Sequence, residues 1–251
     1  MVADRGAVFN ATGARLARML LAALVLAASP VPAASQQLVL SLSESWGATA
    51  AQVRRYGRSA AKAAWMPVGP EVTASLGRRG LGWGRGLHTS DGLLGPSKRE
   101  GDGKAPAGVF DLRCATGYAA TPPTGTKLPY RIATATLRCV DDTASAFYNR
   151  LVDEAQVKRD WSSAEDMRRP DDLYRLVVWV GHNDAPVEPP GGSCIFLHLR
   201  ASPTATTEGC TALDSAPMEA LLTWLDPARR PVLVQLPRQA YRELARTWGL
   251  P

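Results

Sequence analysis

The stretch GSCIFLHLRASPTATTEGCTALDS, residues 192–215, combines a strong fold signal with a cysteine in an unusual setting. Residues 192–199 form a short apolar run of the kind that builds a buried strand. Small and polar residues then follow up to Cys210, which lies between Gly209 and Thr211 and is therefore predicted on a loop. The stretch predicts a strand that carries His198 near its end and a loop that returns with Cys210.

A thiol in this position has the features that a nucleophile needs. The thiolate is the reactive form, and a nearby imidazole or a helix N-terminus makes it accessible near neutral pH. His198 precedes Cys210 by twelve residues, and a predicted helix starts at Ser215. Gly209 lets the backbone turn tightly, so that amide groups could face an oxyanion. Two structural alternatives stay open: a bridge from Cys210 to Cys194, and a merely hydrogen-bonded strand-end histidine.

The pattern around this stretch is mainly β. Upstream, LYRLVVWVGHN (residues 173–183) predicts a central strand that ends near His182. Alternating or apolar runs predict further strands, and amphipathic spacing predicts a few helices. The expected strands are 36–45, 52–56, 63–77, 108–112, 128–142, 173–183, 192–199 and 231–237, and the expected helices are 144–156, 215–226 and 238–250.

Residues 78–112 are rich in glycine and lack periodicity, which predicts a long functional loop that ends in the short strand GVFDL. A flexible linker is the alternative. Trp83 and His88 lie inside this segment, and such residues are unusual in a simple spacer. Trp83 and His88 are therefore candidates for lining a cleft, and packing is an equal alternative for Trp83.

The N-terminus predicts a secretory signal in residues 1–34. Arg15 and Arg18 precede the apolar run 19–28, and small residues follow it. The run is short for a membrane span, although an uncleaved anchor is the alternative. The expected result is an exported protein of the periplasm or cell envelope, a monomer with no other membrane segment. Residues 35–251 are expected to form one domain.

Composition limits the function classes. The chain has 251 residues, 45% of them hydrophobic, which is ordinary globular composition. Its formal net charge of +6 includes three arginines and one aspartate in residues 1–34, which leaves about +4 on the rest. Charges of both signs are interleaved, so nucleic acid is not an expected partner.

Four cysteines are present: Cys114, Cys139, Cys194 and Cys210. Export permits disulfides, and Cys114 and Cys139 are the expected bridge because both adjoin strand-like segments. Cys194 is then expected to be free and buried. No CxxC or HExxH spacing occurs, so neither a metal nor another cofactor is expected.

The order of these residues resembles the L,D-transpeptidase catalytic domain of bacteria (the YkuD-like family). His198 followed by Thr207-Glu208-Gly209-Cys210 is similar to the family's His and its Ser/Thr-His-Gly-Cys core. Residues 105–110, Ala-Pro-Ala-Gly-Val-Phe, are similar to an upstream family segment. Glu208 stands where the family commonly has His. The resemblance implies a β-sandwich-like domain with Cys210 as nucleophile, His198 as general base, and the Gly209–Cys210 backbone near the oxyanion.

The resemblance also implies a substrate. The family transfers acyl groups between peptidoglycan stem peptides: the thiolate attacks the carbonyl of the third stem residue, a diamino acid, and expels the terminal D-alanine. Beside this, we consider His182 as an orienting group and Arg200 as a carboxylate ligand, because a guanidinium matches a carboxylate bidentately. The alternatives are an L,D-carboxypeptidase or amide hydrolase with the same two residues, and a non-catalytic wall-binding domain.

Overall fold

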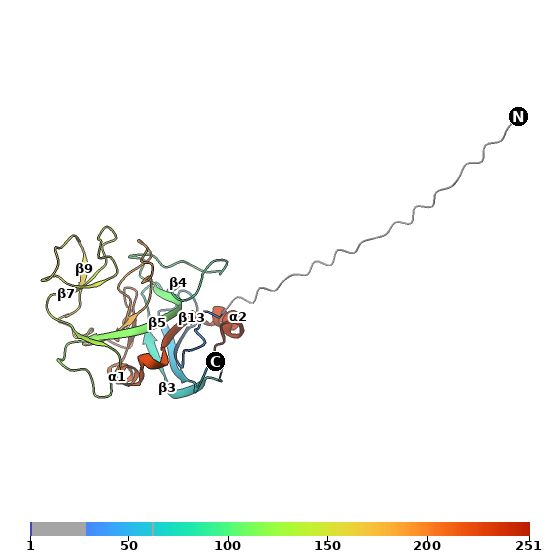
Figure 1. Cartoon of the computed structure of the whole chain (residues 1–251), viewed down its shortest axis with the longest axis horizontal. Helices are drawn as coiled ribbons and strands as arrows, with labels where there is room; N and C mark the ends of the chain where they lie inside the picture. The colour runs from blue at the N-terminus through green and yellow to red at the C-terminus, as the bar shows by residue number, and fades with distance from the viewer. Residues whose placement is uncertain (2–28, 62) are drawn as a thin grey trace.

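The computed structural model describes residues 29–61 and 63–251, together with Met1 (Figure 1). The segment on which most of the secretory signal is predicted, residues 2–28, lies outside the described residues. Residues 29–34 pack against the domain: Val31 is buried, and the hydroxyl of Ser29 donates to the carbonyl of Trp248. The guanidinium of Arg58 donates to the carbonyls of Pro32, Ala33 and Ser35.

The described chain is built around one ten-stranded sheet that closes on itself. Its strands run β10-β11-β12-β3-β2-β1-β13-β5, and β5 pairs back with β10. Strands β4 and β6 both pair with β5 at its two ends. The mainly β fold with few helices is confirmed, and the sheet forms a barrel rather than two separate layers. The ring strands are β1 (Gln37–Ser43), β2 (Ala50–Gly57), β3 (Met66–Ser75), β5 (Ala105–Gly117), β10 (Leu176–Val180), β11 (Phe196–Leu199), β12 (Thr211–Leu213) and β13 (Val232–Pro237), with β4 (Leu81–Trp83) and β6 (Tyr130–Ile132) beside them.

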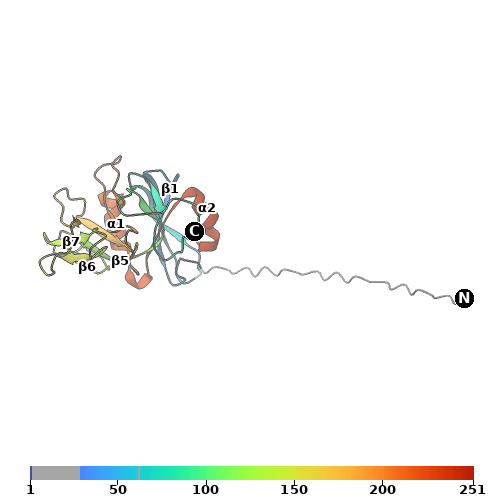
Figure 2. The ribbon, with the colours of Figure 1, turned by 90° about the horizontal axis from the view of Figure 1, so that it is seen from above.

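A second, three-stranded sheet in the order β8-β7-β9 forms what we call the cap, residues 137–166. Its strands are β7 (Leu137–Val140), β8 (Leu151–Asp153) and β9 (Ala164–Asp166). Figures 1 and 2 show the cap at one end of the molecule and the C-terminal helix α2 (Arg238–Trp248) at the other. The structure of the cap contradicts two expectations from the sequence. Residues 128–142 are two short strands in different sheets, and residues 144–156 hold turns and β8 instead of a helix.

Four buried clusters occur in the described residues, one of them inside the cap around Trp161, and the other three hold the parts together. One packs against helix α1 (Ser215–Trp224) and includes Leu197, Leu199 and Leu213. A second lies towards α2 and includes Trp83 and Trp248. The third lies under the cap and includes Phe196 and Cys210. Strand β11 therefore buries both of its faces, which explains its continuous apolar sequence.

The remaining expected strands and helices are present, but β10 and β11 are shorter than the expected strands 173–183 and 192–199. The helices expected at residues 215–226 and 238–250 are α1 and α2, and a 3₁₀ turn, η1 (Pro227–Arg229), follows α1. Residues 78–104 form a loop that contains only the short strand β4, whereas β5 is much longer than the predicted strand 108–112. No helix in the described residues is long and apolar enough to span a bilayer.

Candidate active site

Cys210 is positioned by the parallel pair β11–β12. Leu197 pairs with Thr211 and His198 with Ala212, so Cys210, just before β12, lies beside Phe196. The main-chain N–H of Phe196 donates to the Cys210 sulfur at 3.3 Å. This contact fixes the thiol at the start of strand β12, where the loop predicted from the sequence ends.

His198 and Cys210 lie on the same side of this strand pair. Side chains alternate along a strand, so Phe196 and His198 face one way while Leu197 and Leu199 face the other. The register extends this alternation to Cys210, which packs with Phe196 under the cap. Phe196 lies opposite Cys210 on the neighbouring strand, and His198 follows two residues later with its side chain on the same side.

The hydrogen bonds of His198 select its tautomer. Its Nδ1 lies 2.7 Å from the carbonyl oxygen of Leu199, and because a carbonyl only accepts, Nδ1 carries the proton. The lone pair is then on Nε2. The ring of Tyr174 packs edge-on against the imidazole at 5.1 Å, which limits its rotation. Burial lowers the pKa of His198 to about 4, so the ring is neutral at pH 7 and can accept a proton.

Cys210 rests as a neutral thiol. Its sulfur lies 3.5 Å from the carbonyl oxygen of Cys194, to which the S–H donates. Burial raises the pKa of the Cys210 thiol well above its ordinary value, and the nearby charge of Glu165 acts in the same direction. A neutral thiol and a neutral imidazole that line one cavity can act together if the proton moves to the imidazole as the sulfur attacks.

Gly209 and Thr207 shape the turn into Cys210. The hydroxyl of Thr207 donates to the carbonyl of Cys210 at 2.7 Å and accepts from the N–H of Gly209 at 3.2 Å. A Cβ at position 209 would lie 3.0 Å from the carbonyl oxygen of Lys104, so the main chains approach closely here. The turn is therefore held from both sides, as a nucleophile loop requires.

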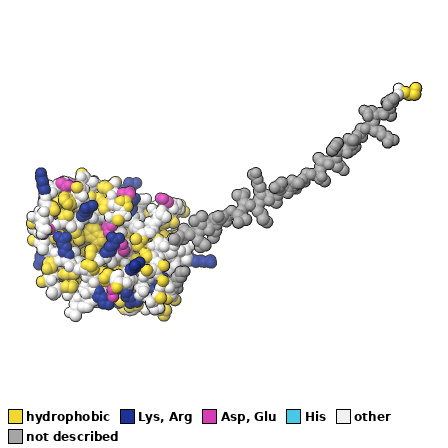
Figure 3. Space-filling model, in the orientation of Figure 1, with side chains coloured by type: hydrophobic (Ala, Val, Ile, Leu, Met, Phe, Trp, Pro, Cys, Tyr) yellow, Lys and Arg dark blue, Asp and Glu magenta, His cyan; other side chains and the backbone are white. Residues whose placement is uncertain are grey.

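A cavity of about 450 Å³ lies between the cap and the barrel over Cys210. Of the residues singled out from the sequence, Cys210, His198, Gly209 and Arg200 line it. Ionisable and hydroxyl residues that the sequence did not single out line it as well: Lys98, Glu100, Asp141, Glu165, Arg169, Tyr174 and Ser193. Figure 3 shows that charges of both signs are interspersed on one face of the molecule.

Arg200 already forms an ion pair with Asp214. Its guanidinium makes a two-pronged contact with Asp214, with Nε and Nη2 each 2.5 Å from a carboxylate oxygen. The side chain is only 9% exposed. Arg200 therefore lies at the cavity with its charge balanced, and Asp214, the residue before α1, is the partner that the sequence did not indicate.

Trp83, His88 and His182 do not line this cavity. The Nδ1 atom of His182 accepts from the N–H of Arg85, and Nε2 donates to the carbonyl of Gly191 at 3.0 Å. Burial lowers the pKa of His182 to about 3. His88 and Trp83 stack near Trp248 in the cluster towards α2. None of the three therefore lies at the cavity over Cys210: Trp83 packs in the cluster towards α2, His182 is held by main-chain groups, and His88 lines a separate cavity.

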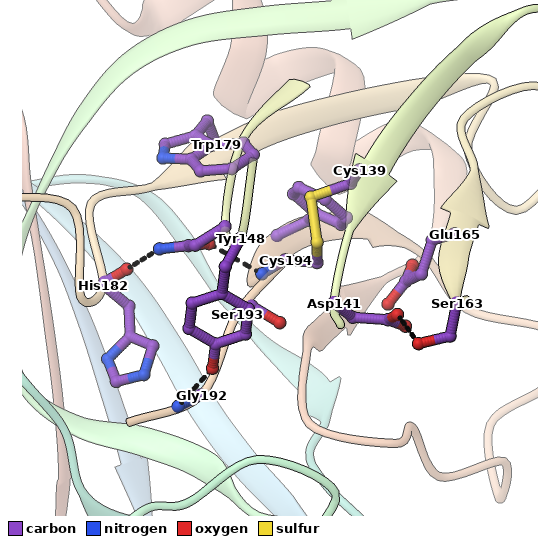
Figure 4. Close-up of a disulfide and its surroundings, with 12 residues drawn as sticks. Cys139, Asp141, Tyr148, Ser163, Glu165, Trp179, His182, Gly192, Ser193 and Cys194 are labelled. Carbon is purple, nitrogen blue, oxygen red and sulfur yellow. Dashed lines mark hydrogen bonds between the residues drawn. A yellow bond between two sulfur atoms is a disulfide. The ribbon is translucent and has the colours of Figure 1, made fainter. Parts of the chain in front are cut away.

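The disulfide joins Cys139 of β7 to Cys194, and Cys114 and Cys210 are free. The expected Cys114–Cys139 bridge is wrong because Cys114 lies on barrel strand β5, whereas Cys139 lies in the cap. Figure 4 shows the bridge tying the cap to the segment before β11, with Asp141 and Glu165 beside it. Cys194 has a φ of +54°, which is rare for a residue other than glycine, and its N–H donates to Asn149 Oδ1.

No cluster of metal-ligating residues occurs in the part of the chain that the structure describes. The family model described as the L,D-transpeptidase catalytic domain matches residues 61–234. No curated protein and no solved structure matches the chain. The family match covers the barrel strands from β3 to β12, the cap, His198 and Cys210, whereas β1 and β2 precede it.

Proposed function

Because this chain belongs to the L,D-transpeptidase catalytic-domain family, we propose that it is an exported cysteine acyltransferase that acts on peptidoglycan stem peptides. The observation that carries the proposal is that a free thiol, Cys210, and an imidazole with an unprotonated Nε2, His198, line the same cavity from neighbouring strands. The Cys139–Cys194 disulfide supports export, since such bridges persist in oxidising compartments.

The proposed mechanism follows from the neutral resting states of Cys210 and His198. His198 Nε2 takes the proton from the Cys210 thiol as the sulfur attacks the carbonyl carbon of the third stem residue. The tetrahedral oxyanion collapses, the C–N bond to the terminal D-alanine breaks, and the imidazolium gives its proton to the departing amine. In the second step an amine of another stem attacks the thioester and His198 accepts the amine proton. The C–S bond then breaks, and the imidazolium returns that proton to the departing Cys210 sulfur. The main-chain N–H of Cys210 is the proposed stabiliser of the oxyanion, because the N–H of Gly209 already donates to the hydroxyl of Thr207.

A non-catalytic wall-binding domain is disfavoured by the cysteine pairing. A Cys194–Cys210 bridge would have removed the nucleophile, but Cys194 is bonded to Cys139 and the Cys210 thiol is free. A hydrolase with the same pair uses water in the second step, and the products distinguish it from a transferase.

Intact-mass spectrometry tests the proposal. The wild-type protein and the Cys210→Ala variant are incubated with a stem tetrapeptide, and separately with a carbapenem as a thiol-directed acylating agent. We expect a thioester adduct on the wild type only, and a crosslinked dimer or an exchanged D-amino acid among the products. His198→Gln should slow acylation by about 10²–10⁴-fold, the usual contribution of a general base. Absence of any adduct on Cys210 contradicts the proposal, and trimmed monomer alone indicates the hydrolase.

A further inference from the structure

The cations and carboxylates that line the cavity are unequally paired. Each cation that lines the cavity pairs with a carboxylate outside the cavity wall: Lys98 pairs with Asp102, Arg169 with Asp171 and Arg200 with Asp214. The lining carboxylate Glu208, at the opposite side from the cap, pairs with Arg78. By contrast, the lining carboxylates Glu100, Asp141 and Glu165 form no ion pair within the described residues.

Glu165 is the best placed of these carboxylates. Its Oε2 accepts from the hydroxyl of Tyr174 at 2.5 Å, and the ring of Tyr174 packs against His198. No hydrogen bond reaches Oε1 from any described residue. Glu100, in contrast, accepts from both Tyr148 and Ser193. Glu165 is therefore held rigidly near the catalytic imidazole with one oxygen unused.

Asp141 adds to the negative charge at the same place. It follows β7 while Glu165 lies on β9, and Figure 4 shows the two side chains close together beside the disulfide. The carboxylate of Asp141 accepts from the hydroxyl of Ser163 at 2.5 Å. Burial raises the pKa of Glu165 to about 7, and the charge of Asp141 contributes in the same direction. A cation bound here would relieve this cost of ionisation.

We propose that Glu165, assisted by Asp141, is a specificity-determining residue that binds the protonated side-chain amine of the diamino acid in the donor stem. The proposal rests on the proposed function, since it assumes that a stem peptide enters this cavity. A primary ammonium fits the site because it donates several hydrogen bonds as a compact charge. Its capture at the cap would hold the stem while the adjoining carbonyl faces Cys210 on the barrel wall.

Binding measurements in the Cys210→Ala background test the inference without turnover. Calorimetry compares a stem tetrapeptide that has a free side-chain amine with the same peptide acetylated on that amine. We expect the free-amine peptide to bind at least tenfold more tightly. Glu165→Gln, which keeps the shape of the side chain, should bring the ratio close to one, and Glu165→Asp should recover part of it. The matched control is Asp166→Asn, because Asp166 is the next residue of β9, is exposed and pairs with Arg138.

The outcomes separate the two proposals. An affinity ratio near one in the Cys210→Ala protein, or an unchanged ratio after Glu165→Gln, overturns the inference. If Glu165→Gln weakens both peptides equally, the residue has only a structural role, and the inference is again overturned. If the amine preference is present but the Cys210-containing enzyme forms no thioester with the stem or the carbapenem, the proposed function fails while the amine site stands.

Discussion

The carbonyl oxygen of Cys194 accepts the S–H of Cys210 at 3.5 Å, and the sulfur of Cys194 itself is bonded to the cap. Cys210 and the cap are thus joined through a single residue, Cys194. Motion of the cap relative to the barrel would therefore act on the thiol directly as well as on the carboxylates above it.

Reduction of the Cys139–Cys194 bridge should release the cap. The bridge closes a separation of 55 residues, and loop-closure entropy for that length corresponds to about 4 kcal/mol of stability. We expect a large drop in the thermal midpoint, and loss of acylation at temperatures where the protein is still folded, on reduction or in Cys139→Ser with Cys194→Ser. Cys114→Ser is the control and should change neither. Full acylation activity of the reduced protein would show that the cap needs no covalent link.

The reactivity of Cys210 should rise steadily with pH. Because burial raises the pKa of its thiol, only a small fraction is thiolate at pH 7 without substrate. In a Cys114→Ser background, the rate of alkylation by iodoacetamide should increase about tenfold per pH unit from pH 7 to pH 9. A preformed thiolate–imidazolium pair would instead give a rate that is constant over this range, and that result would contradict the neutral resting state.

Stability should fall as the pH drops from about 6.5 towards 4. Burial lowers the pKa of His88 to about 4, of His182 to about 3 and of His198 to about 4, so in this window the unfolded chain binds protons that the folded chain does not. Glu165 and Asp184 act oppositely, because burial raises their pKa values to about 7 and about 6. The three histidines make the unfolded chain bind more protons, and the two carboxyls make the folded chain bind more. The difference is about one proton, so the free energy of unfolding falls by about 1.4 kcal/mol for each pH unit.

Urea unfolding at pH 4.5, 5.5 and 6.5 measures this dependence. The midpoint should move to lower urea concentration at each step down in pH. A flat or opposite dependence would mean that the buried histidines accept protons in the folded state.

Two glycines with left-handed backbone provide a matched test of packing. Gly80 has a φ of +74°, and an added Cβ would lie 2.0 Å from the carbonyl oxygen of Trp46. Gly92 has a φ of +78° with nothing within 4 Å. Gly92→Ala should cost about 1 kcal/mol from the backbone alone. Gly80→Ala should cost several times more, as measured by chemical denaturation, and equal losses would contradict the close approach at Trp46.

Much of the barrel, the position of His198 on a strand and that of Cys210 after a returning loop could be predicted because their signals are local. Strand β11 is an uninterrupted apolar run, and α1 has apolar residues at helical spacing. The cap could not be predicted in this way. Strand β9 has only three residues, too few to show alternation, and its segment is charged because Glu165 faces a cavity. The disulfide depends on which sheet each cysteine joins, and the sequence contains no local signal for that.

The two ends of the described domain lie close together on the surface of the molecule. Ser29 is hydrogen-bonded to the last residue of α2, while the cavity lies beside the cap at the other end of the molecule (Figure 2). A tether, tag or immobilising surface attached before Ser29 or after Pro251 would therefore leave the cavity facing outward. The domain can be presented to an insoluble polymer from either terminus without blocking its access to the thiol.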